Sequence, residues 1–182
     1  PRFVPIGDDQ LFIFTGDQYN PNAFRIDLKA DIHKSIYIGE FNAVDKVGDV
    51  YIVSKLFLDG CANGGEYYIY NISTNVLSKL FSEQRGASCL PNRSGNVVLG
   101  IDNKKGLIVA NFNTKEGLDG YPRTEYYDIV GIAPDDPYTT ISIVPHTKMP
   151  ENISSVALIK STQSIMLKGD KTYIYSLGMK TL

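Results

Sequence analysis

The sequence predicts an all-β protein of antiparallel strands, and three observations support this fold class. The 182 residues include 12 Tyr, eight Phe, 16 Gly and nine Pro but no Trp, a balance typical of short aromatic-rich strands joined by many turns. Short apolar runs recur between Gly, Asp, Asn or Pro residues, which is the signature of strands. The connections at 102–106 and 168–171 have the Asn, Asp and Gly content of tight hairpins, so neighbouring strands should be antiparallel.

The apolar runs predict about eleven strands. In chain order they span residues 11–15, 24–28, 35–38, 50–57, 67–72, 97–101, 107–112, 140–144, 155–159, 164–167 and 172–177. A further stretch, 73–81, has apolar residues at helical spacing and also fits a turn followed by a strand. We favour a turn at 73–75 and then a strand, because the surrounding segments are all strands.

A repeated unit of about 40 residues runs through the first two thirds of the chain. Each copy has a turn, an apolar strand, a variable loop and a second strand, which in the first two copies is rich in aromatic residues and Ile. When Phe24, Tyr67 and Leu107 are taken as equivalent positions, the spacings are 43 and 40 residues. This period is that of a four-stranded β-propeller blade.

Residues 1–14 and 50–80 resemble the TolB-like/PD40 group of β-propeller repeats. In those repeats a Pro-x-aromatic-Ser-Pro-Asp-Gly turn leads into a strand and then into a second strand of the type Ile-Tyr-x-x-Asp. The resemblance extends over roughly residues 1–115, and Val4 and Ile6-Gly7 depart from the family's turn. It implies antiparallel, β-propeller-like blades. The same strand spacing also fits a β-sandwich or barrel, and both architectures stay open.

We expect residues 1–182 to form a single all-β domain. Four blades of about 43 residues would nearly fill the chain, so it would be a small four-bladed ring or a fragment of a larger propeller. A fragment would expose unpaired blade faces and would need a partner chain to complete the fold. After residue 115 the period fails, and we expect a long loop-rich insertion at 116–139.

The insertion at 116–139 is the predicted binding surface, because long connections on a rigid β scaffold commonly carry binding residues. Tyr and Arg are favoured in recognition patches. The candidate ligand-binding residues are Tyr121, Arg123, Glu125, Tyr126, Tyr127, Asp128, Asp135, Asp136 and Tyr138. The alternative is that residues 126–130 form another edge strand whose aromatic side chains pack on the body of the domain.

Cys61 and Cys89 are the only cysteines, and each lies in a Gly-rich or polar stretch. Free cysteines are usually buried among apolar neighbours, so this placement favours a Cys61–Cys89 disulfide over two unrelated thiols. A disulfide indicates a secreted, periplasmic or cell-surface protein. Asn71, Asn92 and Asn152 begin N-glycosylation patterns, which are sites if the protein is secreted by a eukaryote and coincidences otherwise.

Composition and motifs argue against several functional classes. Eighteen Lys and Arg residues against 20 Asp and Glu residues give a net charge of −2, so no nucleic-acid partner is expected. No apolar run approaches the roughly 18 residues of a membrane span. His33 and His146 are isolated and no paired-cysteine motif occurs, so we expect no metal site and no cofactor.

We therefore expect a non-catalytic binding or assembly module of an exported or cell-surface protein, which recognises a protein or glycan through loop surfaces. The alternative from another class is a carboxylate-dependent glycoside hydrolase, with Asp8-Asp9, Asp128 or Asp135-Asp136 as candidate acid and base. A third hypothesis is a chain fragment completed by a partner subunit. That hypothesis predicts a large exposed apolar face.

Overall fold

The protein is all-β, as the sequence predicts. The computed structural model describes residues 1–17, 19–30, 34–59, 62–84, 95–102, 104–116, 122–136, 140–145 and 153–177. All strand pairs in these segments are antiparallel, and the segments contain no α-helix. The contacts divide the chain into two compact units, residues 1–82 and 83–182.

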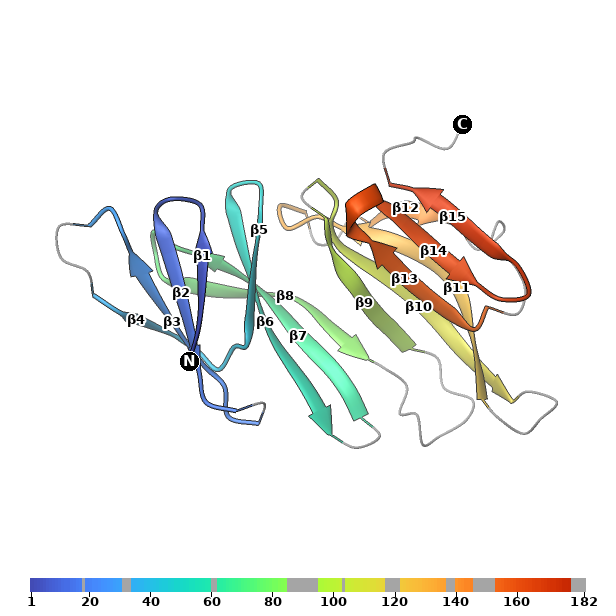
Figure 1. Ribbon diagram of the computed structural model, residues 1–182, viewed down its shortest axis with the longest axis horizontal. Coiled ribbons are helices and arrows are strands. Elements are labelled where there is room, and N and C mark those ends of the chain that lie inside the picture. The colour runs from blue at the N-terminus through green and yellow to red at the C-terminus, as the bar shows by residue number, and fades with distance from the viewer. Residues whose placement is uncertain are drawn as a thin grey trace. The chain divides into compact units, whose positions relative to one another are not determined.

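The first unit consists of two meanders, in which strands that are consecutive in the chain are neighbours in the sheet (Figure 1). The strands of the first meander are β1 (Arg2–Ile6), β2 (Gln10–Thr15), β3 (Asn22–Asp27) and β4 (Ile36–Gly39). The strands of the second are β5 (Ala43–Val47), β6 (Val50–Asp59), β7 (Ala62–Asn71) and β8 (Val76–Gln84). The last two residues of β8 belong to the second unit, where Gln84 pairs with Asn96.

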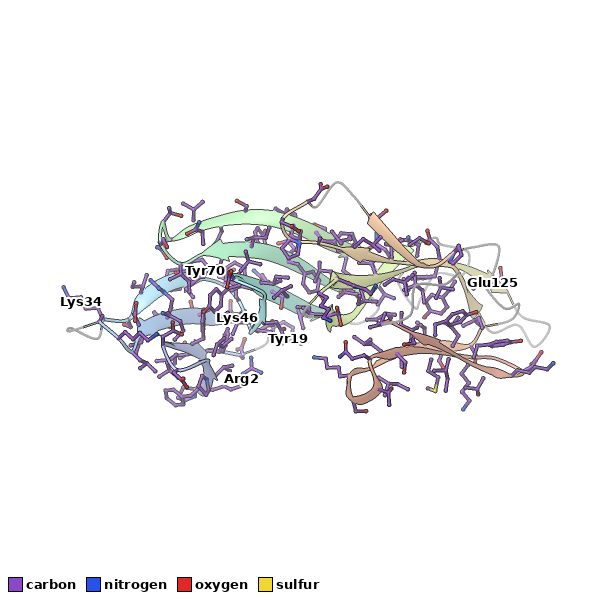
Figure 2. The ribbon with its side chains drawn as sticks, turned by 90° about the horizontal axis from the view of Figure 1, so that it is seen from above. Arg2, Tyr19, Lys34, Lys46, Tyr70 and Glu125 are labelled. Atoms are coloured by element: carbon purple, nitrogen blue, oxygen red, sulfur yellow. The ribbon has the colours of Figure 1, made fainter. Side chains whose placement is uncertain are left out.

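The two meanders of the first unit pack face to face around an aromatic core. Burial alternates along β2, and its inward residues Phe12 and Phe14 are buried. The ring of Phe12 lies 5.6 Å from that of Tyr51 on β6 and 6.4 Å from that of Tyr70 on β7. Figure 2 labels Tyr70, which lies between the two sheets. Because strand side chains alternate between faces, the opposite residues of β2 point away from this core.

The second unit also contains two meanders. The strands of the first are β9 (Gly95–Asp102), β10 (Gly106–Glu116), β11 (Pro122–Ile132) and β12 (Thr140–Val144). The strands of the second are β13 (Ser155–Ile159), β14 (Ser164–Lys168) and β15 (Thr172–Ser176), with a 3-10 turn at Lys160–Thr162 between β13 and β14. Buried residues of both meanders, among them Ile108, Ile129, Ile165 and Leu167, form one core cluster.

Face-to-face packing is close at Gly100 on β9. A Cβ atom added there would lie 2.6 Å from Cδ2 of Leu158 on β13. The missing side chain therefore lets the two sheets of the second unit approach each other. Two antiparallel sheets packed in this way occur both in β-sandwiches and between neighbouring propeller blades.

Strand β11 occupies the middle of the segment that the sequence predicts as a loop-rich insertion. Residues 122–132 of the segment 116–139 therefore form a strand. It is not an edge strand, because it lies between β10 and β12. Its register against β10 shifts between Asn111 and Phe112, so that Tyr127 is the extra residue of a bulge. The alternative that residues 126–130 form a strand is therefore confirmed, and its edge position is wrong, because β11 pairs on both sides.

Two further strands lie where the sequence does not predict them, and both are edge strands. Strand β1 contains Pro5, and β5 contains Asp45 and Lys46. Proline and charged residues are tolerated at an edge, where one side of the backbone needs no partner strand. All eleven predicted strands are present. The predicted turn and strand at 73–81 are also confirmed, and Asn75 in the turn has a φ of 55°.

The predicted hairpin at 102–106 is held by a buried carboxylate. Asp102 is 6% exposed, and its Oδ1 accepts the backbone N–H groups of Lys104 and Lys105 at 2.9 and 2.8 Å. Gly106 follows with a φ of 74°, and a Cβ atom there would lie 2.1 Å from the carbonyl oxygen of Ile132. This turn therefore requires both its Asp and its Gly.

Two glycines of the first unit test how far its turns tolerate a side chain. Gly16 and Gly48 both have positive φ, 84° and 58°, but a Cβ at Gly16 would lie 2.0 Å from the carbonyl oxygen of Asn20, whereas Gly48 has no atom within 4 Å. We expect Gly48→Ala to lower the free energy of unfolding by about 1–2 kcal/mol, because alanine is strained in the left-handed conformation. Gly16→Ala should lower it by clearly more, because its Cβ would also clash with the backbone of Asn20. Urea unfolding followed by circular dichroism measures both, and equal losses would contradict this account of the β2–β3 turn.

Candidate functional site

An aromatic-rich row crosses the outer face of the β1–β4 sheet. The register places Phe3 opposite Ile13, Ile13 opposite Phe24, and Phe24 opposite Tyr37. These four residues, one from each strand, are called the aromatic row below. Cross-strand neighbours on one face are close enough for their side chains to touch. The row therefore runs from one edge of the sheet to the other.

The local sequence explains why the row points outward. Side chains alternate along each strand, so the inward positions Phe12, Phe14 and Ala23 leave Ile13 and Phe24 on the opposite face. On β4 the pairing with β3 shifts between Ala23 and Phe24. Because of the shift, Ile38 has no partner residue on β3. Ile38 lies in the core and is 8% exposed, whereas its neighbour Tyr37 faces outward and is 51% exposed.

The row is both exposed and internally packed. Phe3 is 58% exposed, and Ile13 and Phe24 are half-buried. The rings of Phe24 and Tyr37 lie 5.3 Å apart at 55°, and the Tyr37 hydroxyl donates a hydrogen bond to Asn22 Oδ1 at 3.4 Å. These contacts restrict the rings before any partner arrives. Aromatic side chains held in this way lose little entropy on binding.

The outer face continues as an uncharged apolar surface beside the row. The next outward-facing residues are Pro5, Leu11 and Ile26, which are also paired across the strands. None of these side chains carries a charge or a hydrogen-bonding group. Exposed apolar surface that is contiguous over several strands is uncommon on a monomeric protein and marks an interaction site.

The β2–β3 turn joins the ends of the two strands that carry the middle of the row, Ile13 and Phe24. Tyr19 in this turn is 67% exposed, and Figure 2 labels it. Asp17 orders the turn, since its Oδ1 accepts the N–H groups of Tyr19 and Asn20, each at 2.8 Å. Those backbone hydrogen bonds, first that of Asn20, hold the pKa of Asp17 below its usual value. The β2–β3 turn thus presents an exposed aromatic side chain on a hydrogen-bonded backbone.

The inner face of the same sheet carries a buried cation. Arg25 is 5% exposed, its Nη1 donates to Gln10 Oε1 at 3.3 Å, and its guanidinium lies 5.8 Å from the ring centroid of Tyr70. Burial raises the pKa of Tyr70, and Arg25 opposes that shift. This cluster is closed to solvent by the packed sheets, so its role is structural.

Sequence reasoning missed the aromatic row, although a signal was present. The run Leu11-Phe12-Ile13-Phe14 is apolar on both faces of β2 rather than alternating. Such runs are typical of strands that are covered on both sides. In the first unit only the inner face of β2 contacts the core cluster. The second apolar face was the sign that an apolar surface remains outside the core.

The structure spreads the predicted ligand-binding residues over different environments. Glu125, Tyr126 and Asp128 are half-buried in β11, Asp135 and Asp136 are exposed after it, and Arg123 and Tyr127 lie in β11 with side chains outside the described part. Tyr121 and Tyr138 lie outside the described residues. A binding role for this set stays a prediction.

Two members of that set have structural contacts. The ring of Tyr126 lies 5.9 Å from that of Phe112 and packs against the core of the second unit. Asp128 accepts a hydrogen bond from Asn111 Nδ2 at 2.5 Å across the β10–β11 pair. For Tyr126 the alternative that the aromatic side chain packs on the body of the fold is therefore confirmed.

Several other predicted positions cannot be placed. Cys61, Cys89, Asn92, Asn152, His33 and His146 lie outside the described residues. Asn71 is exposed at the end of β7, where its side-chain oxygen accepts the N–H of Thr74 at 3.1 Å. Within the described segments, no three His, Cys, Asp or Glu side chains gather as they would around a metal ion.

No family model, curated protein or solved structure matches this chain. In the part of the chain that the structure describes, no helix has the length and apolar character needed to cross a membrane. The function proposed for this chain therefore rests on the geometry of the candidate site and not on a relative.

Titratable side chains cluster on β7 and β8, and they pair with one another. Lys79 Nζ lies 2.7 Å from Glu66 Oε1, and the Tyr68 hydroxyl donates to Glu66 Oε2 at 3.1 Å. The hydrogen bond from Lys79 is the main cause of a lowered pKa at Glu66, and Glu66 in turn raises the pKa of Lys79. Burial, and then the bond to Glu66, raises the pKa of Tyr68. A carboxylate held ionised in this way is a poor general acid.

The dependence of Glu66 on Lys79 can be tested by titration. We expect the Glu66 carboxyl, followed by carbon-13 NMR, to titrate below the usual range, and Lys79→Met to raise its pKa toward that range. The stability that this pair contributes is present above the ordinary carboxyl pKa and is lost as pH falls through the lowered value. Lys46→Met is the matched control, because Lys46 faces Tyr51 at 5.6 Å instead. An unchanged Glu66 pKa in Lys79→Met would contradict the assignment.

Proposed function

We propose that this chain is a non-catalytic binding module, and that the outer face of the β1–β4 sheet binds another protein. The observation that carries the proposal is the aromatic row, in which Phe3 and Tyr37 remain more than half exposed. Covering apolar surface contributes about 25 cal/mol per Å² to association. Large aromatic side chains at the centre of a contact dominate its free energy.

The chemistry of the outer face favours a protein over a glycan. A sugar-binding face needs polar groups beside its aromatic rings to satisfy the hydroxyl groups of the sugar. On one side the neighbours of the row are Pro5, Leu11 and Ile26, which offer only apolar side-chain surface, and on the other side lie Thr15 and Asn22. Asn22 already accepts the Tyr37 hydroxyl, so a partner that is apolar over most of its contact fits this face better than a sugar does. The recognition surface is then a sheet face, rather than the loop surfaces expected from the sequence.

Repetition within the first unit supports a propeller-like origin for this face. The first residues of β1 to β4 (2, 10, 22 and 36) precede those of β5 to β8 (43, 50, 62 and 76) by 41, 40, 40 and 40 positions. Gly7 and Gly48 occupy equivalent turns, each followed by Asp, and their φ values are 63° and 58°. We propose that the two meanders are copies of one blade-like unit. In a propeller both faces of a blade are covered, so a partner chain that completes the fold would bind the same surface.

The compartment proposal rests on the cysteines. We propose that Cys61 and Cys89 form a disulfide in an exported or cell-surface protein, because both lie in polar turn-rich sequence. Binding modules outside the cell commonly combine a β scaffold with such a cross-link.

Replacing the two exposed rings of the row tests the binding proposal. The double variant Phe3→Ser and Tyr37→Ser should keep its fold, because both side chains are more than half exposed. Cross-linking of the chain to extracts of its source cells, followed by mass spectrometry, identifies candidate partners, which are then purified. We expect the variant to bind such a partner at least about 30-fold more weakly by calorimetry, equivalent to about 2 kcal/mol.

The matched control is Val76→Ser with Ile141→Ser, two apolar residues that are 53% and 42% exposed and lie on β8 and β12, outside the β1–β4 sheet. The control should bind as the wild type does. Equal binding by the row variant would overturn the proposal. A glycan-array signal that depends on the row, without any protein partner, would replace the protein with a sugar as the ligand.

Intact mass spectrometry after thiol blocking tests the disulfide. We expect no blocking reagent on the native chain and two additions after reduction, because a Cys61–Cys89 bond consumes both thiols. Reduction should also lower the midpoint of thermal unfolding, since the cross-link restricts the unfolded chain. Two additions before reduction would refute the bond and remove the support for export.

A further inference from the structure

Strand β15 forms an open edge of the second unit. It is the last strand of the β13-β14-β15 sheet, and among the described residues it pairs only with β14. The strand is Thr-Tyr-Ile-Tyr-Ser and contains no charge and no proline. Exposed edges are usually protected by such residues, as β1 is by Pro5 and β5 by Asp45 and Lys46.

The pairing with β14 fixes which backbone groups of β15 face outward. The N–H of Leu177 donates to the carbonyl of Gln163 at 2.8 Å, so odd-numbered residues direct their backbone groups toward β14. In an antiparallel pair these groups alternate from one residue to the next. Thr172 and Ile174 therefore direct their N–H and C=O groups to the open edge.

The sequence of β15 is nearly the same when read in either direction. A two-fold axis at Ile174 places Ile174 opposite its copy, Thr172 opposite Ser176 and Tyr173 opposite Tyr175. The central pair is then a hydrogen-bonded one, which is the pairing that the outward groups of Ile174 require. Lys171 comes to lie opposite Leu177, so the charge that flanks the strand meets an apolar residue and no like charge.

Side chains support the same arrangement. Ile174 is 67% exposed, and it lies in register with Met166 on β14, which in turn pairs with Ala157 on β13. This apolar row lies on the face opposite to the buried residues Ile165 and Leu167. Two sheets joined at β15 would continue the line of Ala157, Met166 and Ile174 into the second copy. Ile174 would then be covered by Ile174 of that copy.

We infer that two copies of this chain associate through antiparallel pairing of β15 about Ile174, forming one continuous six-stranded sheet. The partner is a second copy because the edge complements itself in hydrogen bonding, side chains and charge. A two-fold contact of this kind closes on itself and stops at the dimer. The contact is small, so the dissociation constant should be in the micromolar range or weaker.

Sedimentation velocity over a range of concentrations tests the dimer. We expect the wild-type chain to shift from 20.2 kDa toward twice that mass. Ile174→Lys would place two like charges opposite each other on the axis, and should weaken dimerisation at least about tenfold. Its circular dichroism should be unchanged, because the side chain is mostly exposed. Ile141→Lys is the control, since Ile141 is 42% exposed on the edge strand β12, and it should dimerise normally.

Disulfide trapping tests the register and distinguishes this dimer from other contacts. On a hydrogen-bonded antiparallel pair the Cα atoms lie about 5.5 Å apart, within the range of a disulfide. Ile174→Cys should therefore give a reducible dimer whose cross-link joins position 174 of both copies. Thr172→Cys is on the same strand and face, but its two copies would be about 14 Å apart, so it should not cross-link.

Several results would overturn the inference. They are a monomer at every concentration, a dimer that Ile174→Lys leaves intact, and cross-linking of Thr172→Cys as efficient as that of Ile174→Cys. Assemblies that grow beyond the dimer would also overturn it, because they require an open contact rather than a two-fold one.

Discussion

Face-to-face burial of antiparallel meanders is the interaction on which the structure depends. In the first unit the ring of Phe12 packs between Tyr51 and Tyr70, and in the second unit Ile108 and Ile129 share a core with Ile165 and Leu167. A single meander has no apolar interior of its own, so each becomes stable only when another covers it. The hydrogen-bonded ladders supply alignment, and the buried side chains supply most of the stabilisation.

This construction also explains where apolar faces and unprotected edges remain exposed. A sheet has two faces, and packing two sheets together covers one face of each. The outer face of the β1–β4 sheet is apolar where a solvent-facing sheet would usually be polar, with Phe3 and Tyr37 at its ends. The edge of β15 lacks the charge or proline that usually protects an edge. The first feature belongs to the unit of residues 1–82 and the second to the unit of residues 83–182.

Sequence reasoning predicted the strands that have a local apolar pattern, and it missed those that do not. Strands β2 and β14 show apolar runs bounded by turn residues, and both were predicted. Strand β11 lies in a Gly-, Pro- and Asp-rich stretch that was predicted as a loop-rich insertion, with a strand at 126–130 only as the alternative. The aromatic row was missed for a different reason. Phe3, Ile13, Phe24 and Tyr37 are far apart in the chain, and only strand register brings them into one line.

The sequence by itself determined the all-β class, the antiparallel hairpins and the turn positions, because those follow from residue alternation and from the conformations that Gly, Asn and Asp allow. Only the tertiary structure decided which face of each sheet is buried, where β11 pairs, and that β15 remains at an edge. Those features depend on contacts between residues distant in the chain. A local pattern shows which residues share a face of a strand, but contacts with other strands and sheets determine which of the two faces is covered.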